Sequence, residues 1–294
     1  SVKSPLKIVS EQGECILYEP YDCFSILPSI ETTEQELQIP ADVAICPACV
    51  QELTNSENRR YGYGLLNCVL CGPRYTIISH MPYDRVNTSL RAFSLCDACQ
   101  TDYINPVDRR FHAQAISCKQ CGPKVTLLDA QGQCVANGTL AAIINAAATI
   151  EAGGIVAIKG LGGYQLMCDA CNTYAVELLR QRKGRPDKPF AVMYPDNINN
   201  PLEFIKPEYT IDNQARELLQ SDVRPIVLLT PSDANRLSPA INPGLCEVGV
   251  MLPATALHYL LLQQLKKPIV ATSANRSGEP IINTHEDLQH KLGK

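Results

Sequence analysis

Cysteine pairs are the residues of this sequence with the clearest chemistry. Eight of its 14 cysteines form four Cys-x-x-Cys pairs, and the second two pairs repeat the first two at an offset of 50 residues. Two thiolates separated by two residues can hold one ion from a single turn, and a second such turn completes a tetrahedron. Each repeat, Cys-x2-Cys-x18-Cys-x2-Cys, has the spacing of a structural four-cysteine zinc site. The sequence therefore predicts two Zn²⁺ ions, with the ligands Cys46, Cys49, Cys68 and Cys71 for one and Cys96, Cys99, Cys118 and Cys121 for the other.

The flanking residues are duplicated together with the cysteines. Arg59-Arg60-Tyr61 recurs as Arg109-Arg110-Phe111, and Gly72-Pro73 recurs as Gly122-Pro123. Because a duplicated unit should carry its own site, we expect each ion to be bound within one repeat. The alternative is nested pairing, in which the first and the last Cys-x-x-Cys pairs share an ion. A disulfide framework is less favoured, since secreted disulfide scaffolds are usually short.

Two further candidate ligands are not expected to bind metal. Cys168 and Cys171 form a fifth Cys-x-x-Cys pair, but no matching pair follows, and a closed zinc site needs four ligands. His112 lies within the second repeat, but the eight cysteines of the two repeats already satisfy two ions. We therefore interpret His112 as a residue that makes a hydrogen bond between domains.

A cluster of positive charge is the second feature with chemical meaning. Five cations lie within nine residues and are opposed only by Asp187; they are Arg180, Arg182, Lys183, Arg185 and Lys188. Gly184 and two prolines restrict this backbone, so a loop here can present cations without an ordering cost on binding. Lys183 and Arg185 are therefore candidate ligands for phosphate oxygens. The simpler interpretation is a solvated helix end, because cations favour helix C-termini.

Two other turns carry polar groups just after expected strands. Lys159 precedes a glycine-rich turn, 160–163, which matches neither the P-loop nor the Rossmann pattern and is most simply a tight turn. A cation at a strand end nevertheless faces the crevice beyond the sheet. Ser273 and Asn275, in the segment 272–278, are good ligands for phosphate or ribose but are equally common in loops.

Bulk properties restrict the class of protein. At 294 residues the chain should contain about two domains. A net charge of −4 argues against broad nucleic-acid binding and favours a small polyanion at the cationic cluster. No signal peptide or membrane span is predicted from these residues, and the many free or metal-bound thiols favour a reducing cytoplasm.

Three regions follow one another along the chain. Residues 1–30 are too short to bury a core, and the chain begins without Met, so we expect a truncated chain with the remnant of a preceding domain. Residues 31–130 form the metal-binding region, with zinc units at 46–71 and 96–121. From residue 137 to 294, alternating helix and strand signals predict an α/β domain with a twisted sheet whose strand directions stay open. Helices are expected at 139–151, 172–183, 213–220, 255–265 and 285–292, and strands at 155–158, 190–194, 226–230, 248–252 and 269–272.

Taken together, these motifs resemble the HypF family of carbamoyltransferases, which act in [NiFe]-hydrogenase maturation. The resemblance covers nearly the whole chain. In the cysteine-rich part the matching residues are the two four-cysteine units, 72–74, 82–85 and 108–114. In the α/β part they are 157–163, 168–170, 183–189, 247–253 and 272–278. The cysteine-rich unit alone is also similar, more weakly, to that of DnaJ chaperones.

The resemblance implies a tandem four-cysteine zinc-finger module followed by a YrdC-like domain. Such domains bind ATP through a Lys-x-Arg and a Ser-x-Asn pair, here Lys183, Arg185, Ser273 and Asn275. Lys159 is a further candidate for the ATP or adenylate site, where it would orient carbamate or phosphate. The implied reaction joins carbamate, derived from carbamoyl phosphate, to the AMP part of ATP with Mg²⁺ as counter-ion. Lys183 and Arg185 would be catalytic by stabilising negative charge, and HypE would be the protein that later accepts the carbamoyl group.

The same resemblance implies that this chain performs only part of that reaction. The acylphosphatase-like domain survives only as residues 1–30, and the C-terminal domain that transfers carbamoyl to HypE is missing. Two alternatives remain open. One is a threonylcarbamoyl-AMP synthase for tRNA modification, which shares the YrdC-like core, although the zinc repeats argue against it. The other is a zinc-dependent protein-binding module with a nucleotide-sensing α/β domain.

Overall fold

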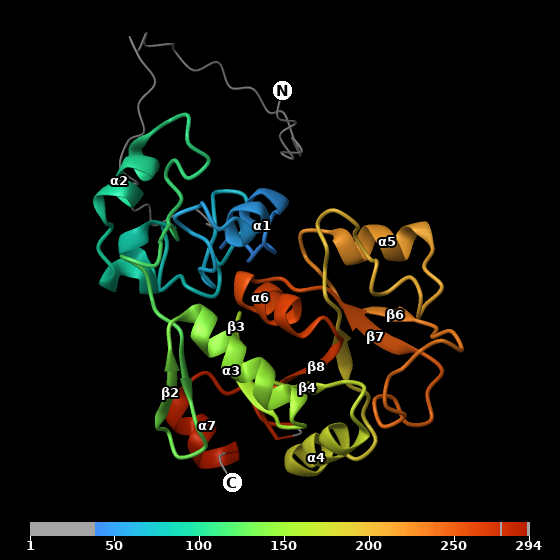
Figure 1. Ribbon diagram of the computed structural model, residues 1–294. Helices are drawn as coiled ribbons and strands as arrows, with labels where there is room; N and C mark the ends of the chain where they lie inside the picture. The colour runs from blue at the N-terminus through green and yellow to red at the C-terminus, as the bar shows by residue number, and fades with distance from the viewer. Residues whose placement is uncertain (1–38, 277, 293–294) are drawn as a thin grey trace, which may run out of the picture. The chain divides into compact units, whose positions relative to one another are not determined.

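A computed structural model describes residues 39–276 and 278–292 (Figure 1). These residues belong to one compact unit, Glu36–Lys294. The helices are α1 (Pro47–Thr54), α2 (Asp97–Ile104), α3 (Thr139–Glu151), α4 (Thr173–Lys183), α5 (Asn213–Gln220), α6 (Ala256–Leu265) and α7 (His285–Leu292), with two 3-10 turns, η1 (Arg85–Asn87) and η2 (Ser89–Ala92). The strands are β1 (Thr126–Leu128), β2 (Cys134–Asn137), β3 (Val156–Gly160), β4 (Gly163–Asp169), β5 (Ala191–Met193), β6 (Val227–Leu229), β7 (Val248–Met251) and β8 (Ile269–Ser273). The remnant expected at residues 1–30 lies outside the described residues.

The two cysteine repeats have the same local fold. α1 and α2 are each 8 residues long, and the first cysteine of each repeat, Cys46 or Cys96, is the N-cap. Each helix stops at an asparagine, Asn55 or Asn105, whose backbone N–H bonds the carbonyl four residues earlier. The unpaired N–H groups of a helix start carry partial positive charge. Both helices therefore begin where thiolates are stabilised.

The α/β part is built on one mixed sheet of six strands, in the order β3-β4-β8-β5-β7-β6. β5 and β7 are parallel, and the other neighbouring pairs are antiparallel. β3 and β8 both flank β4 and run antiparallel to it, so their carboxyl ends lie at the same end of the sheet. Lys159 on β3 and Ser273 on β8 both occupy that end.

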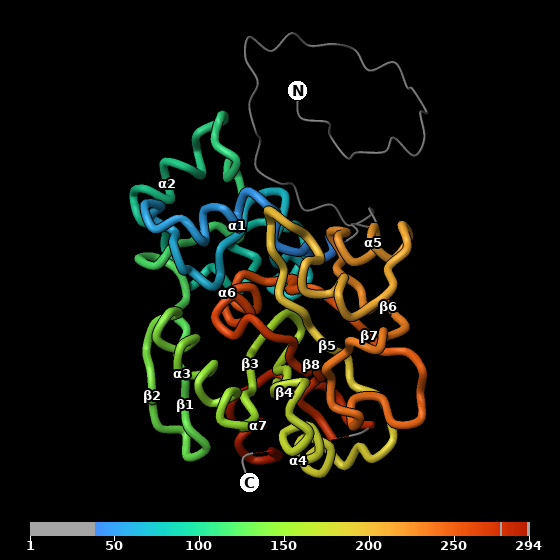
Figure 2. Tube along the Cα trace, turned by 45° about the vertical axis from the view of Figure 1, so that its right-hand side comes forward, coloured from blue at the N-terminus to red at the C-terminus, as the bar shows by residue number. Residues whose placement is uncertain are grey.

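Helices cover both faces of this sheet. Along β4, Leu166 and Cys168 point into one core with α4 and α5, whereas Met167 points into a second core with α3 and α6. This alternation follows from the two-residue period of a strand. The β1–β2 ribbon packs beside α3 (Figure 2).

Nearly all expected elements of the α/β part are present. α4 begins at Asn172, whose side chain accepts a hydrogen bond from the Ala175 N–H, and it ends at Gly184 in the left-handed region (φ 60°). These caps match the sequence signals for the start and end of this helix. β4 was not expected, because both of its faces are buried and its sequence lacks the alternation of a half-exposed strand. The turn at 160–163 is the tight turn of the β3–β4 hairpin.

α6 joins the α/β part to the first cysteine repeat. Its Leu261 and Leu262 pack against the sheet, while Ala256 and Tyr259 pack against Val50 of α1 and its neighbours. A helix that packs on two sides needs a mostly apolar surface, and within α6 only Gln264 is exposed. The domain boundary near residues 130–137 stays a prediction, since both sides belong to one compact unit. Among the described residues, no helix is both long and apolar enough to cross a membrane.

Candidate functional site: two metal centres and a cationic turn

Eight cysteines form two candidate metal centres. The four sulfurs within each repeat all lie within 4.8 Å of one another; the groups are Cys46, Cys49, Cys68 and Cys71, and Cys96, Cys99, Cys118 and Cys121. A tetrahedron with Zn–S bonds of about 2.3 Å places its sulfurs about 3.8 Å apart. The Sγ–Sγ distances are 3.8 Å for Cys46–Cys68, 3.8 Å for Cys68–Cys71 and 3.7 Å for Cys96–Cys118. The residues therefore fit zinc in both centres.

The arrangement decides between the alternatives for the cysteines. Each centre is formed within one repeat, as expected, and nested pairing is wrong. The cysteines of the described chain are free thiols, so the disulfide framework is wrong for them. Cys168 is buried and Cys171 is exposed, and neither belongs to a metal cluster of the described residues. The His112 backbone N–H donates to the Tyr103 carbonyl at 3.0 Å, and its ring packs on Tyr103.

Lys183 joins the two turns that the sequence singled out. Its ammonium, at the last residue of α4, donates to the Ser273 carbonyl, to the Asn275 carbonyl at 2.9 Å and to Asn275 Oδ1 at 3.3 Å. These contacts connect residues about 90 positions apart. Burial, and to a lesser extent the neighbouring Arg185, lowers the pKa of Lys183 to about 8. Lys183 is therefore cationic at neutral pH, and its three N–H donors are all in use.

Arg185 has bonds that hold it in place and also a free donor group. Its guanidinium donates to the Pro189 carbonyl at 2.8 Å and to the Lys188 carbonyl at 3.4 Å, and it lies 5.5 Å from the centre of the Phe190 ring. Within the part of the chain that the structure describes, its Nη1 has no partner. Arg185 can therefore offer N–H donors to a phosphate without breaking existing contacts.

Arg180 has a different role from the other cations of the cluster. It is buried, and its guanidinium bonds five backbone carbonyls, those of Ala240, Ile241, Arg185, Pro186 and Lys188, at 2.6–3.1 Å. It also stacks on the Phe190 ring at 4.6 Å. Three of these carbonyls belong to the cationic turn itself. Arg180 therefore fixes the turn and is not available as an anion ligand.

Sequence reasoning missed the role of Arg180, although a signal was present. Val176, Leu179, Arg180 and Lys183 are all buried on α4. Their spacing, i, i+3, i+4 and i+7, is that of one helix face. The helical spacing therefore places Arg180 and Lys183 on the buried face of α4 and Arg182 on the exposed face.

The Ser-x-Asn turn is ordered by its own hydrogen bonds. Ser273 Oγ donates to Asn275 Oδ1 at 2.6 Å, and Asn275 Nδ2 donates to the Glu279 carbonyl at 2.6 Å. The Ala274 N–H donates to the Tyr164 carbonyl at 2.8 Å, which ties the turn to the start of β4. Hydroxyl, amide and cationic groups thus meet at one end of the sheet.

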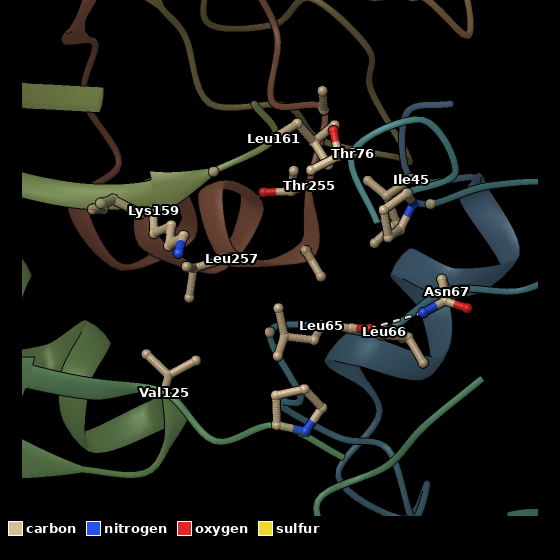
Figure 3. A pocket seen from close by; sticks show the side chains of 18 of the residues that line it. Ile45, Leu65, Leu66, Asn67, Thr76, Val125, Lys159, Leu161, Thr255 and Leu257 are labelled. Atoms are coloured by element: carbon tan, nitrogen blue, oxygen red, sulfur yellow. Dashed lines mark hydrogen bonds between the residues drawn. The ribbon is translucent and has the colours of Figure 1, made fainter. Parts of the chain in front are cut away.

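Lys159 lies at the same end of the sheet but lines a separate cavity. Its ammonium is 5.7 Å from the centre of the Tyr164 ring, its cross-strand neighbour. The cavity has a volume of about 490 Å³ and is lined by β3, by α6 and by the cysteine-rich region. Figure 3 shows the Lys159 ammonium pointing into it beside Leu257, among mostly apolar side chains. Lys183, Arg185, Ser273 and Asn275 do not line this cavity.

Two protein-family models match the sequence. The Sua5_yciO_yrdC model, described as telomere recombination, matches residues 148–294, and the HypF finger matches residues 45–78 and 95–128. The carbamoyltransferase HypF of Synechocystis sp. is 50% identical over 274 residues, which are 93% of this chain and 35% of that protein. The threonylcarbamoyl-AMP synthase of Bacillus subtilis is 32% identical over 152 residues, which are 51% of this chain and 43% of that protein.

A solved structure supports the same relationship. The crystal structure of full-length HypF in the phosphate- and nucleotide-bound form has a TM-score of 0.78 and 38% sequence identity to this chain. The match covers 90% of this chain and 35% of that one. The chain therefore spans about a third of the length of the HypF proteins that it matches.

Proposed function

The chain belongs to the HypF family of carbamoyltransferases, and from this premise we propose that it forms carbamoyl-adenylate from ATP and carbamate. We assign the nucleotide chemistry to residues 137–294 and a stabilising metal module to residues 31–130. The carbamate would derive from carbamoyl phosphate, and the carbamoyl group would later pass to HypE. Thiolate-rich centres of this kind persist in a reducing environment, so we place the activity in the cytoplasm.

The observation that supports this proposal is the contact of Lys183 with Ser273 and Asn275. It brings together the two turns that the ATP site requires, although about 90 residues separate them in sequence. Had these turns lain on opposite faces of the domain, no single triphosphate could contact both. The nucleotide-bound HypF structure, similar over 90% of this chain, adds support from a relative.

In the proposed reaction a carbamate oxygen attacks the α-phosphorus of ATP. The bond between this phosphorus and the oxygen bridging to the β-phosphate breaks, and pyrophosphate leaves with the electron pair. Carbamate is already an anion, so no side-chain base is needed. Arg185 would bind the non-bridging or leaving oxygens through its free donors, while Lys183 holds the Ser273–Asn275 turn and adds positive charge. One such preorganised contact is worth roughly 3 kcal/mol in the transition state.

The ions have supporting roles in this proposal. Mg²⁺ bound to the triphosphate would neutralise part of its charge. Zinc in the two four-cysteine centres would be structural, because four cysteine ligands leave no open position for substrate. Lys159 lies in the 490 Å³ cavity rather than at the cationic turn. We therefore retain it as a candidate for orienting carbamate, not as an ATP ligand.

The proposal is tested by pyrophosphate release from Mg-ATP in the presence of ammonium bicarbonate, which forms carbamate spontaneously in solution. We expect release that depends on both ammonium and bicarbonate. Arg185→Met and Lys183→Met should each lower it at least tenfold. Arg182→Met is the matched control, since Arg182 lies in the same cluster but is exposed, and it should retain the rate.

Two results would assign a different function. Release that requires threonine in place of ammonium would favour a threonylcarbamoyl-AMP synthase. That alternative rests on a match to 51% of the chain, against 93% for the HypF relative. Tight ATP binding with no release under either condition would favour a nucleotide-sensing, protein-binding module.

A further inference from the structure

The duplicated arginine pairs contact the opposite cysteine repeat. Arg59 and Arg60 belong to the first repeat, yet every hydrogen bond that their guanidinium groups make within the described part of the chain goes to the second, at residues 98–117. Arg109 and Arg110 belong to the second repeat, and among the described residues their guanidinium groups bond only the first, at residues 46–67. Each repeat thus supplies the arginines that contact the metal-binding residues of the other repeat.

Equivalent contacts run in both directions between the two repeats. Arg60 Nη2 donates to the Asp102 carboxylate at 2.7 Å, and Arg110 Nη2 donates to the Glu52 carboxylate at 2.5 Å. Asp102 is the counterpart of Glu52 at the same offset of 50 residues as the cysteines. A contact that recurs in both directions is typical of a self-complementary interface.

The backbone contacts repeat as well. Arg60 Nε donates to the Ser117 carbonyl at 3.5 Å, and Arg110 Nε donates to the Asn67 carbonyl at 3.0 Å. Ser117 and Asn67 each immediately precede the third cysteine of their repeat. The arginines therefore reach both the helix and the second cysteine turn of the opposite metal centre.

Some of these arginine donors end on the cysteine sulfurs themselves. Arg109 Nη2 lies 2.9 Å from Cys49 Sγ, and its Nη1 lies 3.6 Å from Cys46 Sγ. On the other side, Arg59 Nη1 lies 3.4 Å from Cys99 Sγ. Four thiolates around one Zn²⁺ ion carry a net charge of −2. Hydrogen bonds from a guanidinium to such sulfurs are charge-assisted and stronger than neutral ones.

The acidic residues aim the guanidinium groups at the sulfurs. Glu52 follows Cys49 by three residues on α1, and Asp102 follows Cys99 by three residues on α2. Residues three apart lie on the same helix face. Each carboxylate therefore holds an arginine beside the cysteine of its own helix. Arg60 and Arg110 are only 3% and 2% exposed, so this contact is shielded from water.

We propose that each metal centre is completed by the arginine pair of the other repeat, so that Arg109 and Arg110 retain the metal of the first repeat and Arg59 and Arg60 retain the metal of the second. The arginines are positioning residues, because they act on the metal through the sulfurs that they hold. This proposal does not depend on the proposed enzymatic activity, and its test measures metal retention alone.

The test compares metal loss from individual centres in the zinc-loaded chain. Arg109→Gln and Arg59→Gln are matched variants, since both side chains are partly exposed and occupy corresponding positions. Each protein is challenged with a chelator and an alkylating reagent, and mass spectrometry identifies which cysteines react. Arg91→Gln is the control, because Arg91 is exposed on the same region of the chain.

The expected result is a crossed pattern. Arg109→Gln should speed alkylation of the cysteines at 46–71 by roughly 10- to 100-fold and leave those at 96–121 near the wild-type rate. Arg59→Gln should do the reverse, and Arg91→Gln should change neither. Faster loss at the centre of the substituted repeat, or equal acceleration at both centres, would overturn the proposal.

A second measurement tests the proposal even if Arg109→Gln folds poorly. The more conservative Arg109→Lys keeps the charge but loses the forked donor geometry. In ¹¹³Cd-substituted protein, where each centre gives its own resonance, this variant should shift only the resonance of the first repeat. A shift confined to the resonance of the second repeat, or no shift at all, would contradict the proposal that Arg109 acts on the metal centre of the first repeat.

Discussion

Arg180→Met tests whether the cationic turn is held from within the protein. In the structure Arg180 is 8% exposed and bonds five backbone carbonyls, three of them in the turn 185–188. Methionine retains an unbranched apolar side chain that can pack against Phe190, so the substitution mainly removes the donors. The carbonyls of Ala240 and Ile241 would then lose a charged partner.

The magnitude follows from these contacts. A hydrogen bond to a charged group contributes about 1.5–3 kcal/mol, and an unsatisfied buried acceptor costs a similar amount. The five bonds are not additive, because carbonyls in the turn can bind water and because burying the guanidinium is itself unfavourable. We expect a net loss of about 3 kcal/mol in the free energy of unfolding. In a chain of this size class this lowers Tm by roughly 6–12 °C.

Thermal unfolding followed by circular dichroism measures this effect, with Arg182→Met as the matched control. Arg182 is exposed, so its substitution should change the free energy of unfolding by less than about 0.5 kcal/mol. ATP affinity, measured by calorimetry at a temperature where both variants are folded, should fall only for Arg180→Met, because a loosened turn must be ordered on binding. Equal Tm values for the two variants would refute the assignment of Arg180 as the residue that fixes the turn.

Three further predictions concern other groups. Burial lowers the pKa of Lys183 to about 8, so ATP affinity measured by calorimetry should fall as pH rises above 8. Lys183→Met should bind ATP weakly, and its affinity should depend less on pH. Equal affinity of the wild-type protein at pH 7 and pH 10 would contradict this prediction. Burial lowers the pKa of His258 to about 4 from 6.5. The unfolded state therefore binds a proton at a higher pH than the folded state does. The free energy of unfolding, measured with urea, should fall by up to about 3 kcal/mol as pH is lowered from about 6.5 to 4. His258→Gln should not show this decrease. Metal analysis should find two zinc ions per chain and about one in Cys71→Ser, because the two ligand sets are separate; an unchanged count in the variant would contradict the assignment of four cysteines to each ion.

Several features of the protein follow from the sequence alone. Cys-x-x-Cys pairs place two ligands in one turn, and their duplication predicted two centres, each within one repeat. Asn172 and Gly184 marked the ends of α4 because capping is a local interaction between neighbouring residues. The succession of cysteine repeats and an α/β part likewise depends on short-range patterns. The same patterns supported the family resemblance, which the sequence and structure comparisons confirmed.

Other features depend on residues that are distant in sequence. The basic cluster did not reveal the role of Arg180, because its carbonyl partners at 240 and 241 lie about 60 residues away in sequence. Lys159 was grouped with the nucleotide ligands, but the sequence did not reveal that it lines a cavity shared with the cysteine-rich region. The repeat of Arg59-Arg60 as Arg109-Arg110 was visible, but not that each pair contacts the opposite metal centre. A local sequence pattern fixes caps and metal-binding turns, whereas the partner of a buried charge is decided only when packing excludes water and leaves specific carbonyls, carboxylates and thiolates within reach.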